Sequence, residues 1–559
     1  MKNRLLFVPL LLSCALACNS NPKVDPCEEA VTLIGECTDT TATYPPEGCV
    51  GVFAEQADAI VEGGCAGLQD DKSDFWCNDF VSWLGRCTQE SLEEVAAIDT
   101  LSEVCPLATR SDALCNALWN AEDLAVDAAA GGDRASARSA LSAAIAEGQS
   151  LYAQDANAAR QDAAYRFLVR ERALSLFVYN VLTASDSQAP PADYSEAAQG
   201  LISEHYPGYP DGRFPFALVD LAPPGPSSCD TPQGLLFFPG VVRLGERDEF
   251  SEQGAAIEAA LPCIHARRVE TGSFVEPSLN ADQADVAVAG LTAEFGEIPL
   301  HTLGYSQGAT NSLTTLVNKP AIATRVRTAI TMNSAAHGSE VADLGQQVLD
   351  PLVTGVEDFC ESLDSIMVPI CESAFSVSPV PADWILELVA GGMGVPLASL
   401  QSFIEAEDGV SAAPDLRRFF ERHLPGIASL STAEAAEFWD KRAGERPRTT
   451  LYYSFRSVIS DTDANLPASN QLFHSLLERA GGDRPFNDMQ VRLDNQKLGG
   501  PIADLEIIGP LAEGNHWQWE LATGAVPEET MPAEMTDRIP HRELLVGYYQ
   551  AVIELGAHR

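Results

Sequence analysis

The sequence predicts an α/β protein in which a mostly parallel, doubly wound sheet follows a disulfide-rich, mainly helical N-terminal region. Two observations support this fold class. From about residue 206 onward, short apolar runs alternate with helical patterns, as they do where right-handed crossovers join parallel strands. Before that point, cysteines are dense and apolar residues recur at helical spacing.

The predicted sheet begins with residues 234–238, whose wholly apolar run is typical of a strand buried on both faces. Further strands are expected at about 264–269, 298–304, 327–332 and 450–455, and helices at about 250–261, 281–295 and 309–317. More than a hundred residues, 338–447, separate the last two of these strands. Because that length is too great for a loop, we expect a helical cap inserted into the sheet domain.

Three regions are expected before the sheet domain at 206–559: a leader at 1–17, a cysteine-rich helical domain at 18–118, and a helical hairpin or linker at 119–205. In the last of these, Gly131-Gly132 before Asp133 indicates a helix stop and a new N-cap. One helical face there gathers four apolar residues: Phe167, Leu174, Phe177 and Val181.

The cysteines indicate disulfides. Apart from Cys14 and Cys18, twelve remain, and eight of these lie before residue 116: Cys27, Cys37, Cys49, Cys65, Cys77, Cys87, Cys105 and Cys115. An even number of scattered cysteines in an exported chain is most simply a disulfide framework. Their spacings of ten or more argue against zinc, which favours close pairs. The sequence leaves the pairing of the eight open, whereas two local pairs suggest themselves downstream: Cys229 with Cys263, and Cys360 with Cys371.

The first residues indicate export. Two basic residues precede an apolar stretch at 5–12 that is too short to span a bilayer as a mature helix. Residues 15–18 (Ala-Leu-Ala-Cys) resemble the lipobox of bacterial lipoproteins, which implies acylation of Cys18; Asn19 after it favours the outer membrane, by resemblance to known sorting. We therefore expect an exported protein, lipid-anchored at the bacterial outer membrane. Plain secretion, or Cys14 as the acylated residue, are the alternatives.

The net charge restricts the partners. The chain has 35 basic and 80 acidic residues, for a net charge of −45. Such a surface repels phosphate backbones and anionic head groups. Nucleic acid is therefore excluded as a partner, and membrane contact is expected through the lipid anchor only.

The run at 304–308 (Gly-Tyr-Ser-Gln-Gly) is the first indication of chemistry. A serine hydroxyl is a poor nucleophile unless a neighbouring base takes its proton. In a nucleophile elbow, a sharp strand-to-helix turn presents the serine, and the two glycines let strand and helix approach. Because the run follows an apolar strand and precedes a helical pattern, Ser306 is predicted to be a nucleophile.

Hydrolysis also needs hydrogen-bond donors for the developing oxyanion. In this arrangement one donor is the amide after the nucleophile, which belongs to Gln307. The second is expected from the turn at 238–241 (Phe-Pro-Gly-Val), where the amide of Val241 is the predicted donor. Each such donor stabilises the transition state by about 3 kcal/mol.

These residues resemble the bacterial secreted triacylglycerol lipases of the α/β-hydrolase superfamily, over residues 234–520. Parts of the likeness are the turn at 238–241, where that family has His in place of Pro239, and the elbow, where it more often has His in place of Tyr305. Further matches are residues 278–280 (Ser-Leu-Asn) before the helix that leads to the elbow, 336–343 (Ala-His-Gly-Ser-Glu-Val-Ala-Asp), 487–491 (Asn-Asp-Met-Gln-Val) and 514–516 (Gly-Asn-His).

The resemblance implies an α/β-hydrolase fold with a helical cap, and it implies that Asp488 and His516 complete a catalytic triad with Ser306. The residues support His516 independently, because a base is expected from a loop after the last strand, and the apolar pair at 507–508 precedes it. Four other histidines fit less well: His337, which more simply orders a turn, His474, His541 and His558. Three carboxylates compete with Asp488: Asp461, Asp463 and, more distantly, Asp494.

The related lipases place an Asp in a calcium site two residues after the catalytic His, where this chain has Gln518. A neutral amide adds no charge to such a site, so no metal is predicted, and no cofactor is needed.

The sequence therefore predicts a serine hydrolase of carboxylic esters, a lipase or esterase acting through an acyl-enzyme on an ester or lipid substrate. Apolar cap residues could line an acyl pocket or simply pack over the sheet: Trp384, Ile385, Leu388, Met393 and Val395. The alternatives are polyester depolymerisation, thioester cleavage, or a surface binding lipoprotein whose hydrolase domain is vestigial; fold resemblance does not choose among them. The sequence does not indicate the partner of the cysteine-rich domain.

Overall fold

The computed structural model describes most of the sheet and the helices around it. The described residues are 112–129, 133–183, 193–205, 231–240, 251–272, 274–344, 425–458, 486–514 and 540–556, with the single residues 32, 105, 346, 474, 477 and 516. The chain divides into two compact units, residues 1–87 and 88–559, and every helix and strand named below lies in the second.

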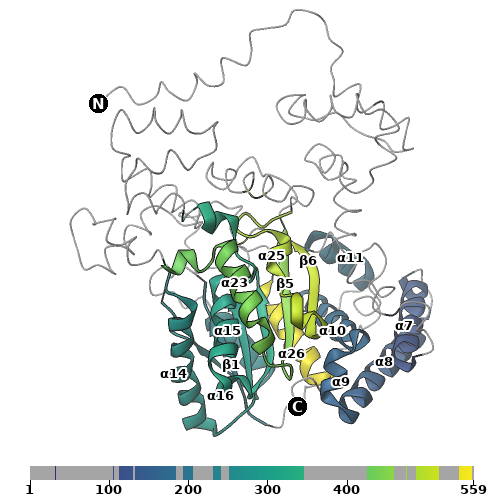
Figure 1. Ribbon diagram of the computed structural model, residues 1–559. Helices are drawn as coiled ribbons and strands as arrows, with labels where there is room; N and C mark the ends of the chain where they lie inside the picture. The colour runs from purple at the N-terminus through teal and green to yellow at the C-terminus, as the bar shows by residue number, and fades with distance from the viewer. Residues whose placement is uncertain are drawn as a thin grey trace, which may run out of the picture. The chain divides into compact units, whose positions relative to one another are not determined.

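A sheet of six parallel strands forms the centre of this second unit (Figure 1). The strands are β1 (Gln233–Phe238), β2 (Ile264–Arg268), β3 (Leu300–Tyr305), β4 (Val326–Met332), β5 (Leu451–Val458) and β6 (Glu506–Glu513). Their order across the sheet is β2-β1-β3-β4-β5-β6. Every residue of β1, β3 and β5 is buried, as expected for parallel strands covered on both faces.

Two hydrophobic clusters cover the two faces of the sheet. Leu235 and Phe237 of β1 belong to one cluster, and their neighbours Leu236 and Phe238 belong to the other, because successive side chains of a strand point to opposite faces. The first cluster includes α10 (Ala163–Thr183), α13 (Ser251–Ala260) and α26 (His541–Glu554). The second includes α14 (Pro277–Phe295), α15 (Gln307–Asn318), α16 (Pro320–Ala323) and η4 (Gly500–Leu505).

The helices before the sheet join the first cluster through α10. They are α7 (Ala113–Ala129), α8 (Arg134–Gln154), α9 (Ala156–Gln161) and α11 (Tyr194–His205). α10 packs along α26, and an ion pair of 2.7 Å between Arg172 and Glu554 links the two helices (Figure 1). Residues long before the sheet in sequence therefore form part of the layer that covers it.

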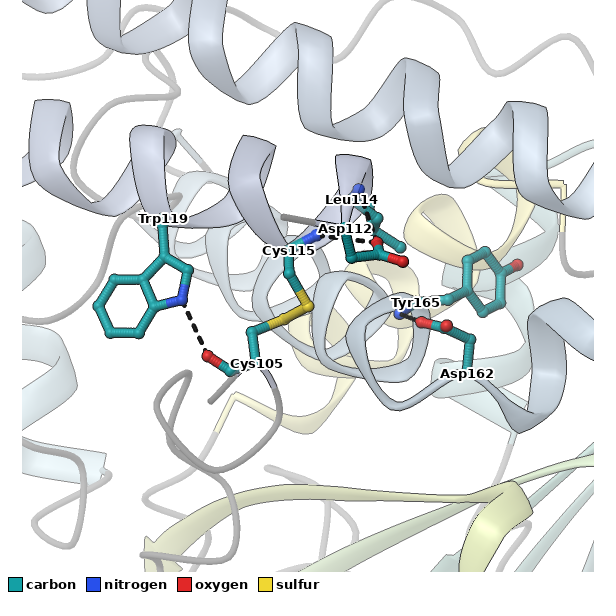
Figure 2. The surroundings of a disulfide bond; sticks show 7 residues. All are labelled: Cys105, Asp112, Leu114, Cys115, Trp119, Asp162 and Tyr165. Carbon is teal, nitrogen blue, oxygen red and sulfur yellow. Dashed lines mark hydrogen bonds between the residues drawn. A yellow bond between two sulfur atoms is a disulfide. The ribbon is translucent and has the colours of Figure 1, made fainter. Parts of the chain in front are cut away.

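A disulfide between Cys105 and Cys115 anchors the start of α7 (Figure 2). The indole nitrogen of Trp119 donates to the Cys105 carbonyl at 2.9 Å, and the Asp112 carboxylate accepts the Leu114 amide at 3.0 Å, so the first turn of the helix is tied down twice. Cys263 is also disulfide-bonded. Cys229, its expected partner, and both cysteines of the 360–371 pair lie outside the described residues.

The remaining elements follow β4 and β5. They are α23 (Thr432–Arg442), η3 (Ala443–Glu445) and α25 (Leu493–Gln496). Most of the expected cap, including its five apolar residues, lies outside the described residues. Among the described helices, none combines the length and the apolar character that crossing a membrane requires.

The structure confirms the predicted strands and helices, with small shifts at their ends. The helix expected at 281–295 begins earlier, at Pro277, because proline is favoured in the first turn, where its missing amide proton costs nothing. Asp133 is the N-cap of α8, as predicted, and accepts the Ala135 and Ser136 amides. The domain boundaries at 118 and 205 stay predictions.

The strand order defines where a site can form. From β1 the chain passes to β2 on one side and then returns to β3 on the other, so the order reverses between β1 and β3. In doubly wound sheets, ligands bind in the crevice at the carboxyl ends of the strands at such a reversal. Phe238, Gly304 and Thr331 lie in register here, so the carboxyl ends of β1, β3 and β4 are level. This six-stranded parallel sheet with helices on both faces fits the α/β-hydrolase fold.

Candidate active site

Ser306 forms the sharp turn between β3 and α15. Its φ of 52° and ψ of −122° are rare for a non-glycine residue, and such conformations cost about 1–3 kcal/mol. Small neighbours make room for the turn. A Cβ on Gly304 would lie 2.5 Å from the Gly308 carbonyl oxygen, and one on Gly308 would lie 1.9 Å from the Phe238 carbonyl oxygen. Both glycines of the predicted elbow are therefore required by the backbone.

The imidazole of His516 lies between Ser306 and Asp488. His516 Nε2 is 2.8 Å from Ser306 Oγ, although 210 residues separate the two in sequence. His516 Nδ1 is 2.8 Å from Asp488 Oδ2. A carboxylate at Nδ1 favours the tautomer protonated there, which leaves Nε2 as the acceptor for the serine hydroxyl. His516 is 4% exposed and Asp488 is fully buried, so little water competes for these bonds.

The turn around Asp488 orients its carboxylate. Asp488 Oδ1 accepts the amides of Gln490 at 3.0 Å and Val491 at 2.7 Å, which leaves Oδ2 for the histidine. Met489 has a φ of 77°, and its amide donates to the side chain of Asn487 at 2.9 Å. This tight turn therefore fixes the orientation of the carboxylate.

The competing residues lie elsewhere or outside the described part. Asp494 pairs with Lys497 at 3.7 Å, and His337 Nε2 lies 2.9 Å from the Leu498 carbonyl oxygen. His474 Nδ1 lies 2.8 Å from Oδ1 of Asn487, the residue before Asp488, and not beside Ser306. His541 is the first residue of α26. Three residues lie outside the described residues: Asp461, Asp463 and His558.

One of the two expected oxyanion donors, the Gln307 amide, lies among the described residues. Gln307 is the first residue of α15, so its amide has no acceptor within the helix and lies at the positive end of the helix dipole. Val241 lies outside the described residues. The turn that leads to it begins at Pro239, whose carbonyl oxygen would lie 2.5 Å from a Cβ on Gly308. The end of β1 and the elbow are thus in close contact, and Val241 as the second donor stays a prediction.

The Gln307 side chain also fixes a neighbouring loop. Gln307 Nε2 donates to the Val275 carbonyl at 3.2 Å. Asn280 Oδ1 accepts the Gly272 amide at 2.8 Å, and Asn280 Nδ2 donates to the same Val275 carbonyl at 3.2 Å. Phe274 in this loop has a φ of 52°. The loop after β2 is therefore held against the residue next to Ser306, a role that the sequence did not reveal for Gln307.

Sequence reasoning also missed two side chains that contact the main chain of His516. The Tyr305 hydroxyl donates to the His516 carbonyl at 2.7 Å, and Asn333 Nδ2 lies 3.3 Å from the same oxygen. An Asn directly after a buried strand was the available signal for the second, since asparagine tolerates positive φ there and Asn333 has a φ of 45°.

No group of three or more His, Cys, Asp or Glu that could hold a metal ion occurs among the described residues. Gln518 and Cys18 lie outside them, so the expectations for calcium and for lipidation stay predictions.

Comparisons with known proteins give distant structural likenesses. No family model and no curated protein matches the chain. It is similar to a metagenomic carboxyl esterase, with a TM-score of 0.42 and 16% identity over 68% of this chain and 90% of that one. It is also similar to a Bacillus licheniformis lipase in its mature form (TM-score 0.31, 15% identity, 53% and 87% covered) and to lipase 1 from Pelosinus fermentans (TM-score 0.34, 12% identity, 59% and 99% covered). At these TM-scores, the likenesses say nothing about the substrate.

Proposed function

We propose that this chain is a serine hydrolase of carboxylic esters, a lipase or esterase, in which Ser306 is the nucleophile, His516 the general base and Asp488 the orienting acid. The continuous series of contacts from Asp488 Oδ2 to His516 Nδ1 and from His516 Nε2 to Ser306 Oγ, each 2.8 Å long, is the observation that supports the proposal most strongly. A vestigial domain kept only for binding has no need to preserve both contacts in a buried site.

In the acylation step, His516 Nε2 takes the hydroxyl proton as Ser306 Oγ attacks the ester carbonyl carbon. The negative charge moves to the carbonyl oxygen of the tetrahedral intermediate. The Gln307 amide donates to that oxygen, with the Val241 amide as the proposed second donor, and each stabilises the charge by about 3 kcal/mol. Asp488 stabilises the imidazolium that forms. The imidazolium then protonates the leaving alkoxide, which departs as the alcohol.

In the deacylation step, His516 removes a proton from water, which attacks the acyl-enzyme carbonyl. The second tetrahedral intermediate collapses, the acid product leaves, and Ser306 Oγ regains its proton from the imidazolium. Neither step requires a cofactor. Every proton that leaves a nucleophile is returned to a leaving group by the same imidazole.

Hydrolysis of p-nitrophenyl esters of increasing chain length tests this function. We expect activity in the purified full chain and its loss in Ser306→Ala, while Ser278→Ala, which removes an exposed hydroxyl at the start of α14, stays active. Preference for long chains favours a lipase and preference for short chains an esterase. Equal activity in Ser306→Ala and the unmodified chain would exclude Ser306 as the nucleophile.

We also propose that the chain is exported and anchored by lipid at Cys18, which rests on the lipobox-like sequence alone. Metabolic labelling with a palmitate analogue tests it. The label is expected on the full chain and not on Cys18→Ala. Equal labelling of the two would reject the anchor.

A further inference from the structure

The main-chain carbonyl of His516 accepts two side-chain hydrogen bonds. Tyr305 Oη donates at 2.7 Å, and Asn333 Nδ2 lies at 3.3 Å. Tyr305 is 3% exposed and Asn333 is fully buried. The Tyr305 ring also lies beside the imidazole, with 5.3 Å between the ring centroids. Two buried donors aimed at one carbonyl form an anchor, since each bond is sheltered from exchange with water.

Both donors come from the elements that hold the nucleophile. Tyr305 is the last residue of β3 and directly precedes Ser306. Asn333 directly follows Met332, whose carbonyl accepts the Ser306 amide at 3.0 Å. The Asn333 amide in turn donates to the Phe455 carbonyl at 3.1 Å, which ties the turn to β5. Tyr305 is therefore adjacent in sequence to Ser306, and Asn333 is adjacent to Met332, the residue whose carbonyl binds the Ser306 amide.

The turn around Asp488, here called the acid turn, also contacts His516, but in a different way. The Asp488 carbonyl accepts the His516 amide at 2.8 Å, and the Asp488 carboxylate binds His516 Nδ1 at 2.8 Å. Both bonds run to the same residue, so on their own they would let His516 move together with the acid turn relative to Ser306. The carbonyl bonds link the histidine to β3 and β4 instead.

We propose that Tyr305 and Asn333 are positioning residues that fix His516 relative to Ser306 by holding the His516 carbonyl. This inference rests on the proposed function, because it concerns the base of the same reaction. It also gives the tyrosine of the Gly-Tyr-Ser-Gln-Gly run a role, where the resembling lipases more often have histidine. Both side chains are buried, so we expect each to act through the distance and angle between His516 Nε2 and Ser306 Oγ.

Tyr305→Phe tests the proposal by deleting one hydroxyl. We expect kcat to fall roughly 10- to 100-fold, since small misplacements of a catalytic group have effects of that size, while KM changes less than about twofold. The rate of Ser306 labelling by a fluorophosphonate should fall by the same factor as kcat/KM, because labelling uses the same base. Asn333→Gly removes the second donor but keeps the positive φ, and should show a smaller loss of the same kind.

Tyr549→Phe is the matched control. Tyr549 is fully buried in α26 within the same cluster as Tyr305, and its hydroxyl has no hydrogen-bond partner among the described residues. We expect its thermal unfolding temperature to change little and its kcat to stay unchanged. An equal fall of kcat in Tyr305→Phe and Tyr549→Phe would overturn the proposal, because it would indicate a general effect on the core.

The outcomes separate this proposal from the function on which it rests. Absence of fluorophosphonate labelling in the unmodified chain would reject the proposed function and the positioning role together. Normal labelling of the unmodified chain, with kcat within about twofold of it in both Tyr305→Phe and Asn333→Gly, would reject only the positioning role. If Tyr305→Phe does not fold, Asn333→Gly decides alone by the same criterion.

Discussion

The two ends of the sheet differ in how they accommodate left-handed backbone. At the carboxyl ends of the strands, four non-glycine residues have positive φ, one in a loop after each of four strands: Phe274, Ser306, Asn333 and Met489. Away from these ends, the described residues with positive φ are all glycines: Gly296 before β3, Gly499 and Gly500 before β6, and Gly556 after α26. Gly338 is a glycine on the carboxyl side.

The difference teaches where this chain retains conformational strain. A glycine adopts positive φ at no steric cost, whereas another residue needs support from its surroundings. Each of the four strained residues lies in or beside the candidate site: Ser306 is its serine, Asn333 contacts the His516 carbonyl, Met489 lies in the turn around Asp488, and Phe274 lies in the loop that Gln307 fixes. Backbone strain is therefore concentrated around the candidate site, whereas glycines carry the positive φ at the opposite end.

The largest effect should come from the acid at the carboxyl end. Asp488→Asn leaves the shape intact but favours the wrong tautomer of His516, so we expect kcat to fall about 10⁴-fold. Asp494→Asn, on the same segment but paired with Lys497, should retain kcat. Steady-state kinetics on a p-nitrophenyl ester measures both. Similar losses in the two variants would show that the segment, and not the carboxylate of Asp488, matters.

The next effect compares two glycines. Gly308→Ala would bring a methyl group against the Phe238 carbonyl at the carboxyl end of β1, and we expect the free energy of unfolding to fall by about 3 kcal/mol. Gly290→Ala, on the open face of α14, should raise it by about 0.5–1 kcal/mol, because alanine favours helix and meets nothing there. Urea unfolding gives both values. An unchanged stability in Gly308→Ala would contradict the close approach of elbow and β1.

Strain at Ser306, the proposed nucleophile, can be measured by comparing two variants. Both Ser306→Gly and Ser306→Ala lack the hydroxyl, but only glycine relieves the positive φ. We therefore expect Ser306→Gly to be more stable than Ser306→Ala by about 1 kcal/mol, measured by thermal or urea unfolding. If alanine proves the more stable of the two, the turn is not strained in solution.

At the amino end, Gly296→Ala should cost stability without affecting activity. The position has a φ of 79° and open space around it, so the loss reflects backbone conformation alone and should be at least about 1 kcal/mol. Urea unfolding and ester hydrolysis measured on one preparation check the two parts. A loss of kcat in this variant would contradict the claim that only the carboxyl ends of the strands affect activity.

The smallest effect concerns pH. Burial lowers the pKa of His337 below its usual value, against the opposing effect of its hydrogen bond to the Leu498 carbonyl. The unfolded chain therefore takes up this proton at a higher pH than the folded chain. Stability should fall as the pH drops through about 6.5 and level off below the lowered pKa. His337→Gln should flatten this part of the curve of unfolding free energy against pH, and an unchanged curve would contradict it.

Much of the fold could be predicted from the sequence because its signals are local. Apolar runs indicated the strands. The apolar run before Ser306 and the helical pattern after it together indicated the elbow. The start of one helix was predicted less well. α14 begins at Pro277, four residues before the expected start. The polar residues of its first turn resemble a loop, so the sequence pattern did not indicate a helix there. Most of the cap and the N-terminal region lie outside the described residues, so their predictions stay untested.

The candidate site could be predicted where a motif marked it and not where only distance in space did. Ser306, Asp488 and His516 were each marked by their neighbours in sequence, and the structure brings the three together. The Tyr305 and Asn333 bonds to the His516 carbonyl span 211 and 183 residues. The residues next to Tyr305 and Asn333 in sequence do not indicate these bonds. The bonds depend on how the ends of β3 and β4 lie relative to the loop after β6.

Mapping a fluorophosphonate adduct on the purified chain tests the central claim most directly. The reagent reacts with a serine only when a base has activated it, and peptide mass spectrometry then identifies the residue. We expect the adduct on the peptide that contains Ser306, and its absence in both Ser306→Ala and His516→Ala. An adduct on another serine, or ester hydrolysis that persists in Ser306→Ala, would contradict the account.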